Sequence, residues 1–228
     1  ISLKSPREIE AMRRAGRITA QARALAASLI RPGITEKEMA EAIRGIYAAH
    51  GCSGVSFPPI CGFGAHAADP HHDNDDTPLE AGQCVLIDVG GVYQDYCSDI
   101  TRTVAVGEIK NQELLNIYRI VRDSKREAEK VLAPGLAMSQ LHKVINQYVE
   151  ERGYKIPHGP GHSFGLDIHE APFISAANDY QLQPGVIHTI EPGIYVPCVG
   201  GVRIEDDYLI TESGFERLTN ITDELIIL

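Results

Sequence analysis

The stretch Ile30-Arg31-Pro32-Gly33 decides the fold, because it returns near the middle of the chain as Leu132-Ala133-Pro134-Gly135. A helical pattern follows each copy and ends at a glycine, Gly51 in the first copy and Gly153 in the second. The proline, its glycine and the closing glycine therefore all shift by 102 residues. Single Pro-Gly pairs are common in turns, but several matches in the same order indicate an internal duplication. The sequence predicts two halves of one architecture, residues 1–107 and 108–228.

The duplication continues into the later part of each half. Leu79-Glu80-Ala81-Gly82 leads through an apolar run to Asp88, and Leu182-Gln183-Pro184-Gly185 leads through another to Glu191. In both halves the carboxylate lies six residues past the glycine. A site at the pseudo-twofold axis between the halves would therefore draw side chains from both.

Local signals give each half two helices followed by strands. Capping boxes at Ser5-Pro6-Arg7-Glu8 and Thr35-Glu36-Lys37-Glu38 open the first two helices, which we expect to reach Ile30 and Gly51. We expect the first strands at 84–89 and 93–106, joined by a tight turn at Gly90-Gly91. The second half repeats the order, with helices near 112–132 and 138–152 and strands near 186–191 and 201–210. This order predicts an α+β domain in which helices cover one face of a curved antiparallel sheet.

Composition restricts the classes of function. The chain has 228 residues, 43% of them hydrophobic, which is enough for a sizeable core. Its net charge of -10, without a run of Lys or Arg, argues against a nucleic-acid partner. No apolar run approaches the roughly eighteen residues of a membrane span. The five cysteines are odd in number and form no C-x-x-C pair, so we expect a reducing compartment and a cytoplasmic protein.

Four acids are the main candidates for chemistry. Asp88 and Asp99 lie eleven residues apart across the predicted hairpin, which can bring their carboxylates together, and Glu191 and Glu205 flank a second glycine-containing loop. A single Asp at a strand end is most often a turn or cap residue. Four carboxylates among apolar strand residues, however, repel one another and lose hydration, so they need counter-charge. Two divalent cations would balance the four charges and leave room for a bridging hydroxide.

Histidines supply the remaining candidates. The segment from His158 through His162 to His169 is rich in glycine, which permits close approach of the backbone to a ligand. Carboxylates with one imidazole, which we assign to His162, suit Mn, Co, Fe or Zn better than a thiolate-type structural zinc site. We interpret His66 and His188, like His50 and His142, as hydrogen-bonded structural residues.

These segments together resemble the pita-bread metallopeptidases, the creatinase and methionine aminopeptidase superfamily. The resemblance covers almost the whole chain, and all five metal-ligand types occur in family order. Within the superfamily the Ser-Asp-x-Thr-Arg-Thr, Ile-Glu-Pro-Gly-x-Tyr and Val-Arg-Ile-Glu-Asp strings are most similar to Xaa-Pro aminopeptidases and prolidases. The strings that carry the resemblance are Asp69-Pro-His71-His72, Leu86-Ile-Asp88-Val-Gly90, Cys97-Ser-Asp99-Ile-Thr101-Arg102-Thr103, Gly161-His162 to His169-Glu170, Thr189-Ile-Glu191-Pro-Gly193 and Arg203-Ile-Glu205-Asp206.

The resemblance implies a role for each matching residue. Asp88 would chelate one metal, Asp99 and Glu205 would bridge both, and His162 and Glu191 would complete the second. Glu191 would also act as general acid-base. His71 and His169 match substrate-contacting imidazoles that stabilise the tetrahedral intermediate. Tyr195 and Arg203 match partners of the ligands, and His158 the histidine that opens the His-x-x-x-His segment.

The expected function is hydrolysis of the first peptide bond of a substrate with a free N-terminus and proline in second place. The resemblance implies a single catalytic domain over 1–228 without the N-terminal creatinase-like domain, and it allows a homodimer. Two departures keep alternatives open: the start of the chain also resembles single-domain methionine aminopeptidases, and Ala65-His66 replaces a small residue and Asn. The alternatives are removal of initiator methionine, a catalytically silent peptide-binding module, and metal-free creatine-type hydrolysis.

Overall fold

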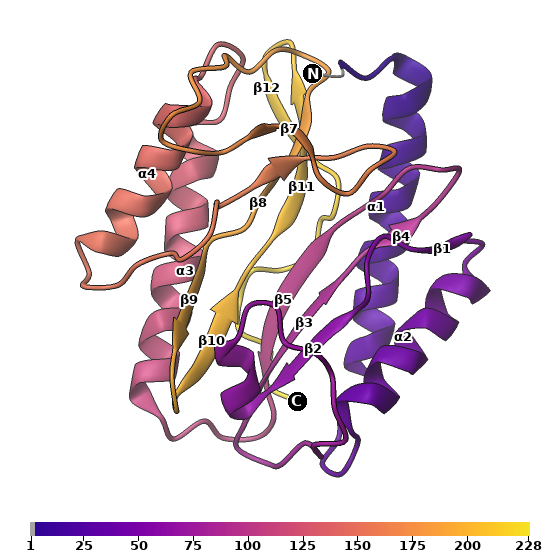
Figure 1. Cartoon of the computed structure of the whole chain (residues 1–228), viewed down its shortest axis with the longest axis vertical. Helices are drawn as coiled ribbons and strands as arrows, with labels where there is room; N and C mark the ends of the chain where they lie inside the picture. Colours follow the sequence, from indigo (N-terminus) through magenta and orange to yellow (C-terminus); the bar gives the residue numbers. More distant parts are fainter. Residues whose placement is uncertain (1–2) are drawn as a thin grey trace.

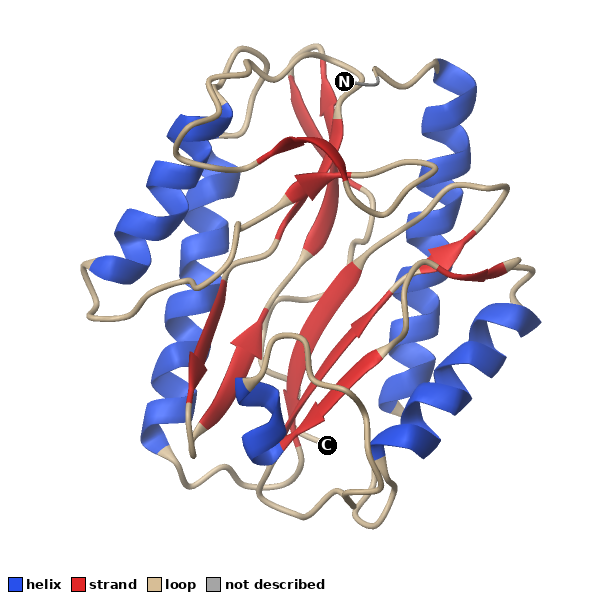
Figure 2. Cartoon of the chain, viewed as in Figure 1, coloured by secondary structure: helices blue, strands red, loops and turns tan. Residues whose placement is uncertain are grey.

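The computed structural model describes residues 3–228. Within this range two pairs of α-helices flank a central set of antiparallel strands, one pair from each half of the sequence (Figure 1). Figure 2 shows the strands running between the two helix pairs, with loops crossing in front of them. This arrangement confirms the predicted α+β class with antiparallel strands.

The first pair of helices begins where the capping boxes predict. Helix α1 spans Pro6–Ala27 and α2 spans Glu36–Ala49. In both capping boxes the N-cap side chain accepts from the backbone amide of the glutamate three residues later, and that glutamate's side chain accepts from the N-cap amide. In the second half, α3 spans Gln112–Val131 and α4 spans Met138–Glu150, within two residues of the predicted bounds. The starts of α1 and α2 depend on local side-chain caps, which is why the sequence places them well, whereas both helices end earlier than expected, at Ala27 and Ala49 instead of Ile30 and Gly51.

The strands of the first half form two small antiparallel sheets. The larger has the order β2-β3-β5, and the smaller pairs β1 with β4. A short 3-10 helix, η1 (Gly64–Ala68), follows β2. The strand bounds are β1 Gly54–Val55, β2 Ile60–Phe63, β3 Cys84–Val89, β4 Gly91–Val92 and β5 Ile100–Ala105.

The strands of the second half form a five-stranded sheet of order β12-β11-β8-β6-β7 and a β9-β10 pair. Their bounds are β6 His162–Ser163, β7 Glu170–Phe173, β8 Ile187–Ile190, β9 Gly193–Val196, β10 Gly200–Arg203, β11 Asp206–Thr211 and β12 Gly214–Arg217.

Two strand predictions are wrong in detail. The segment 93–106 is not one strand, because Gln94 and Asp95 adopt positive φ angles of 50° and 71° in a turn closed by a Tyr93–Tyr96 bridge. That turn replaces the one expected at Gly90-Gly91, where the chain continues into β4. The segment 201–210 likewise breaks into β10 and β11. The first break is a local turn, whereas the second coincides with a bond from the amide of Glu205 to the distant Thr101.

Apolar packing fixes each helix pair against its own strands. In the first half, Met39 and Ile43 of α2 share a buried cluster with Val85 and Ile87 of β3. In the second half, α3 contributes Ile117 to a cluster with buried residues of β9 and β10. Across residues 3–228, none of the helices has both the length and the apolar content needed to cross a bilayer.

The two halves are joined where β5 runs beside the break between β10 and β11. The amide of Glu205 donates to the carbonyl of Thr101 at 3.0 Å. Two residues further along each segment, the Thr103 hydroxyl donates to the carbonyl of Arg203 at 3.3 Å and accepts from its amide at 3.2 Å. This seam places side chains of both halves on one surface.

Candidate active site

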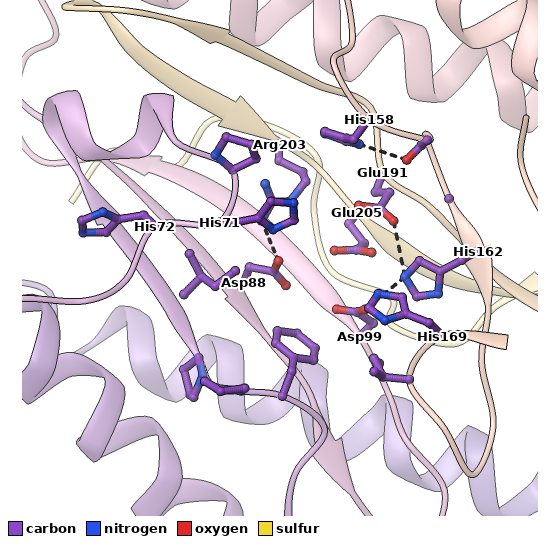
Figure 3. Close-up of a pocket in the computed structure, with 18 of the residues that line it drawn as sticks. His71, His72, Asp88, Asp99, His158, His162, His169, Glu191, Arg203 and Glu205 are labelled. Carbon is purple, nitrogen blue, oxygen red and sulfur yellow. Dashed lines mark hydrogen bonds and ion pairs between the residues drawn. The ribbon is translucent and has the colours of Figure 1, made fainter.

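A cavity of about 550 Å³ lies at the seam between the halves. Every predicted ligand faces it, together with His71, His158, His169 and Arg203, as the close-up in Figure 3 shows. Tyr195 is absent from its lining and contacts His158 and Arg203 instead. The structure therefore brings the predicted site residues together, from positions as far apart in sequence as His71 and Glu205.

The four acids reach the cavity from strand ends and breaks. Asp88 lies within β3, Asp99 directly precedes β5, Glu191 directly follows β8, and Glu205 occupies the break between β10 and β11. Asp99 and Glu205 are 4% and 1% exposed. Among the described residues, one oxygen each of Asp88, Asp99 and Glu205 is buried without a hydrogen-bond partner. Buried carboxylate oxygens are seldom left in this state, so they indicate a missing ligand.

His162 presents a free lone pair to these carboxylates. Its Nδ1 lies 3.1 Å from the carbonyl of Ser163, which can only accept, so Nδ1 carries the proton. Its Nε2 lies 3.7 Å from Asp99 Oδ2 and 3.4 Å from Glu191 Oε1. Ligand atoms of Asp99, His162 and Glu205 all lie within 4.8 Å of one another. This is the arrangement of a metal-binding imidazole held by its other nitrogen.

The charges cannot coexist in this cavity without compensation. Burial, and then repulsion from Glu205 and Asp88, raises the pKa of Asp99 well above its ordinary range. Burial and the Glu191 charge do the same for the pKa of Glu205. Burial also raises the pKa of Glu191, to about 8. Burial lowers the pKa of His162 to about 4, which keeps the imidazole neutral and able to bind a metal.

These observations show that the residues present fit divalent cations. The donors are carboxylate oxygens and one neutral imidazole nitrogen, the set preferred by first-row divalent metals outside thiolate sites. His162 Nε2 lies 3.7 Å from Asp99 Oδ2 and 3.4 Å from Glu191 Oε1, and both distances are longer than an ordinary hydrogen bond. Cations among these groups would also satisfy the buried oxygens that lack partners.

Arg203 holds the first-half acid in place. It is 3% exposed, its Nη2 donates to Asp88 Oδ2, and its Nη1 donates to the Tyr195 hydroxyl at 2.7 Å. The same hydroxyl lies 2.9 Å from His158 Nε2. Burial lowers the pKa of His158 to about 4. Arg203, Tyr195 and His158 thus form a chain of hydrogen bonds that starts at one carboxylate.

His71 and His169 approach the carboxylates from two different loops. His71 belongs to the loop after η1, and Figure 3 shows it beside Asp88 and Arg203. His169 directly precedes β7, and its ring centroid lies 4.5 Å from that of His162. Both imidazoles line the cavity, so both are able to reach a bound molecule.

Two neighbours of the carboxylates were not singled out from the sequence. The hydroxyl of Thr101 donates to Glu205 Oε2 at 2.5 Å. Asp207 is 1% exposed, and its Oδ2 accepts from the amide of Asp99 at 3.1 Å. The run of acids from Glu205 to Asp207 in a predicted core strand carried a signal for Asp207, but its partner lies 108 residues away.

Comparison with known proteins agrees with this geometry. The model of metallopeptidase family M24 matches residues 10–212. An uncharacterized peptidase of Staphylococcus epidermidis is 41% identical over 220 residues, which are 96% of this chain and 62% of that protein. The chain therefore belongs to metallopeptidase family M24, which confirms the resemblance stated from the sequence.

Solved structures give a finer comparison. The Xaa-Pro dipeptidase from Bacillus anthracis superposes with a TM-score of 0.96 and 38% identity, over 99% of this chain and 64% of that one. The X-Pro aminopeptidase from Thermotoga maritima has a TM-score of 0.95 and 36% identity, over 99% and 64%. The chain thus spans less than two thirds of the length of these relatives.

Proposed function

We propose that this chain is the catalytic domain of an aminopeptidase that uses two divalent cations to hydrolyse the first peptide bond of substrates with proline in second place. The observation that carries the proposal is the group of buried carboxylate oxygens without hydrogen-bond partners, drawn from both halves around a neutral imidazole. The similarity to structures named Xaa-Pro dipeptidase and X-Pro aminopeptidase supports the choice of substrate.

Five side chains would hold the cations: Asp88, Asp99, His162, Glu191 and Glu205. Four carboxylates carry four negative charges, which two divalent ions neutralise, and Asp99 and Glu205 are the most deeply buried and the best placed to be shared. Mn, Co, Fe and Zn all suit this donor set. When bound, the cations lower the pKa of a water molecule and polarise the substrate carbonyl.

The chain's own groups then handle protons and developing charge. Glu191 accepts a proton from the attacking water at a carboxylate oxygen and passes it to the leaving amine nitrogen. His71 and His169 donate hydrogen bonds to the carbonyl oxygen as it becomes negative. Arg203 holds Asp88 in position, and its own orientation is fixed by the Tyr195 hydroxyl.

Much of the remaining cavity wall is apolar and suits a proline ring. Its apolar side chains come from the loop before β2 and the start of β2, from the loop after η1 and from the segment around β7, and they are Phe57, Pro58, Pro59, Ile60, Pro70, Ile168, Phe173 and Ile174. A rigid ring loses little conformational freedom on binding such a wall, whereas a flexible side chain loses more.

Cytoplasmic location and a homodimer remain predictions.

A peptide panel tests the proposal. Purified protein loaded with Mn is offered Ala-Pro-type peptides and Met-Ala-Ser side by side, before and after treatment with a chelator. We expect metal-dependent cleavage of the proline peptides alone. Cleavage confined to Met-Ala-Ser would assign methionine removal, and no metal-dependent cleavage with no bound metal would assign a binding role.

A further inference from the structure

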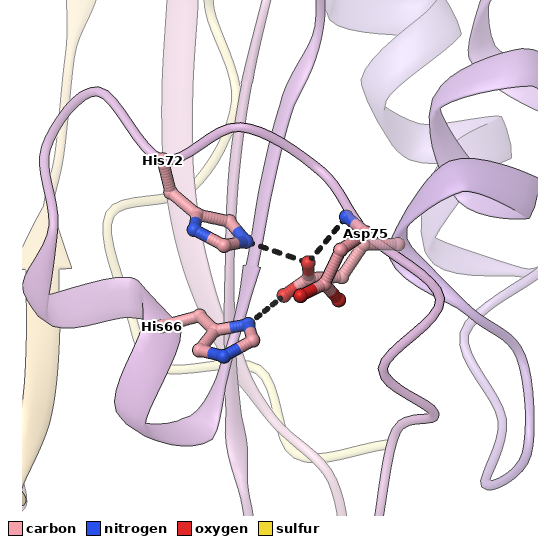
Figure 4. Close-up of side chains that lie close together, drawn as sticks. His66, His72 and Asp75 are labelled. Atoms are coloured by element: carbon pink, nitrogen blue, oxygen red, sulfur yellow. Dashed lines mark hydrogen bonds and ion pairs between the residues drawn. The ribbon is translucent and has the colours of Figure 1, made fainter.

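A second cluster of ionisable groups lies beside the active-site cavity, around Glu36. This residue opens α2, yet it is 0% exposed, which is rare for a glutamate. His66, His72 and Asp75 surround its carboxylate. Figure 4 shows the imidazoles of His66 and His72 close together, each joined by a dashed line to the same carboxylate, which the hydrogen bonds identify as that of Glu36. None of these four residues has a role in the proposed hydrolysis.

The Glu36 carboxylate accepts four hydrogen bonds. Oε1 accepts from the amide of Phe63 at 3.0 Å and lies 2.9 Å from His66 Nδ1. Oε2 accepts from the amide of Asp75 at 3.1 Å and lies 2.6 Å from His72 Nε2. All acceptor positions of the carboxylate are therefore in use.

The distances separate this cluster from a metal site. At the ligand set, His162 Nε2 lies 3.4 and 3.7 Å from carboxylate oxygens, a separation that leaves room for an intervening cation. Around Glu36 the corresponding nitrogen-to-oxygen distances are 2.6 and 2.9 Å, the lengths of direct hydrogen bonds. The carboxylate is thus satisfied by protein donors.

The four bonds are spread along a single loop. Phe63 ends β2, where the loop begins, and Asp75 lies at the far end of the loop. Between these points the chain turns over the cavity, where Pro70 to Asn74 contribute to the lining. His71 is the neighbour of His72 in the chain. The bond from His72 to Glu36 therefore helps to fix the position of the His71 imidazole.

We propose that Glu36 is a positioning residue, whose buried carboxylate holds the 63–75 loop at four points and thereby presents His71 to the reacting carbonyl. The inference rests on the proposed function, since it assumes that His71 donates to the developing oxyanion. Glu36 touches neither the ligands nor the cavity, so it acts only through the loop.

Glu36→Gln tests this with little change in shape. One carboxylate oxygen becomes an amide NH2 group, which cannot accept a hydrogen bond. A histidine facing the new NH2 can change tautomer and accept from it, but the backbone amide of Phe63 or Asp75 cannot. Whichever way the amide turns, one end of the loop therefore loses its anchor.

A double-mutant comparison isolates the path through His71. We expect Glu36→Gln to lower kcat by roughly tenfold to a hundredfold, because small displacements of a catalytic group have effects of this size. In a His71→Ala background the same substitution should change kcat by less than about twofold, since there is no imidazole left to position. An equal loss in both backgrounds would overturn the proposal.

Matched variants separate positioning from general damage. Glu41→Gln changes an exposed acid on the same helix, with a side chain 82% exposed, and should leave kcat unchanged. His66→Ala removes one of the four bonds outside the cavity lining and should lower kcat by about threefold even if Glu36→Gln fails to fold. Full activity in both Glu36→Gln and His66→Ala would overturn the proposal.

Two further readouts do not depend on turnover. Hydrogen exchange at the Phe63 or Asp75 amide should accelerate at least about tenfold in Glu36→Gln, while the ligand set keeps its full metal content. Unchanged exchange at both amides would overturn the proposal about Glu36, whether or not the protein is active. An inactive wild-type protein would instead reject the proposed hydrolase function. Zn²⁺ bound at Glu36, His66 and His72 in the wild type would also overturn the proposal about Glu36.

Discussion

Removal of the metals should make stability fall as pH rises above neutrality. Burial raises the pKa of Glu191 from an ordinary 4.5 to about 8, so in the metal-free folded state this carboxyl holds a proton that the unfolded chain has released. A group with a raised folded pKa stabilises the protein fully below its unfolded pKa. That contribution disappears as pH rises through the folded pKa.

Between pH 7 and 8 the buried acids dominate the pH dependence, and Asp99 and Glu205, whose pKa is also raised by burial, act in the same direction as Glu191. Burial lowers the pKa of His158, His162 and His188 to about 4. These histidines therefore make the protein more stable as pH rises from about 4, and this gain is complete once pH exceeds their ordinary pKa of 6.5. Over this pH range, titration of Glu191 alone should reduce the free energy of unfolding by about 1 kcal/mol. A change of this size lowers Tm by roughly 2–4 °C in a chain of this length.

Urea unfolding in chelator at pH 7.0, 7.5 and 8.0 measures the slope. Glu191→Gln should reduce it, whereas Glu212→Gln, at an exposed position after β11, should leave it unchanged. Saturating Mn should abolish the fall, because the cations replace the protons on the acids. A metal-free protein whose stability is constant or rises from pH 7 to 8 would refute the electrostatic reasoning.

Three further substitutions have defined outcomes. Glu205→Ala should abolish both metal binding and turnover, and metal analysis with a peptide assay checks this; full activity would reject the site. Arg203→Lys should weaken metal binding by about tenfold to a hundredfold in a competition titration, because the single nitrogen of lysine cannot bond Asp88, Tyr195 and Thr101 at once. Gly201→Ala should destabilise the fold by about 1–3 kcal/mol in urea, because the added Cβ would lie 1.8 Å from the carbonyl oxygen of Ala67; wild-type stability would contradict the tight β10–η1 contact.

The sequence predicted features that depend on neighbouring residues. The capping boxes at Ser5 and Thr35 fixed the starts of α1 and α2, because both partners of each box lie within four residues. The strand at 84–89 was predicted to the residue from its apolar run. The ligand candidates followed from a repeated pattern, which local periodicity and spacing reveal.

Features that depend on distant partners were missed. The chain breaks at Glu205 because its amide bonds to Thr101, more than a hundred residues earlier. Glu36 entered the sequence analysis only within a capping box, and its burial depends on Phe63, His72 and Asp75, all of which follow it in the next loop and strand. Such long-range pairings carry no signal in any short window of sequence.

Anomalous scattering from crystals grown with Mn tests the central claim most directly. Two peaks should lie among Asp88, Asp99, His162, Glu191 and Glu205, and both should vanish in Asp99→Ala. A protein that hydrolyses its peptide substrate with no peak among these five residues would contradict the account.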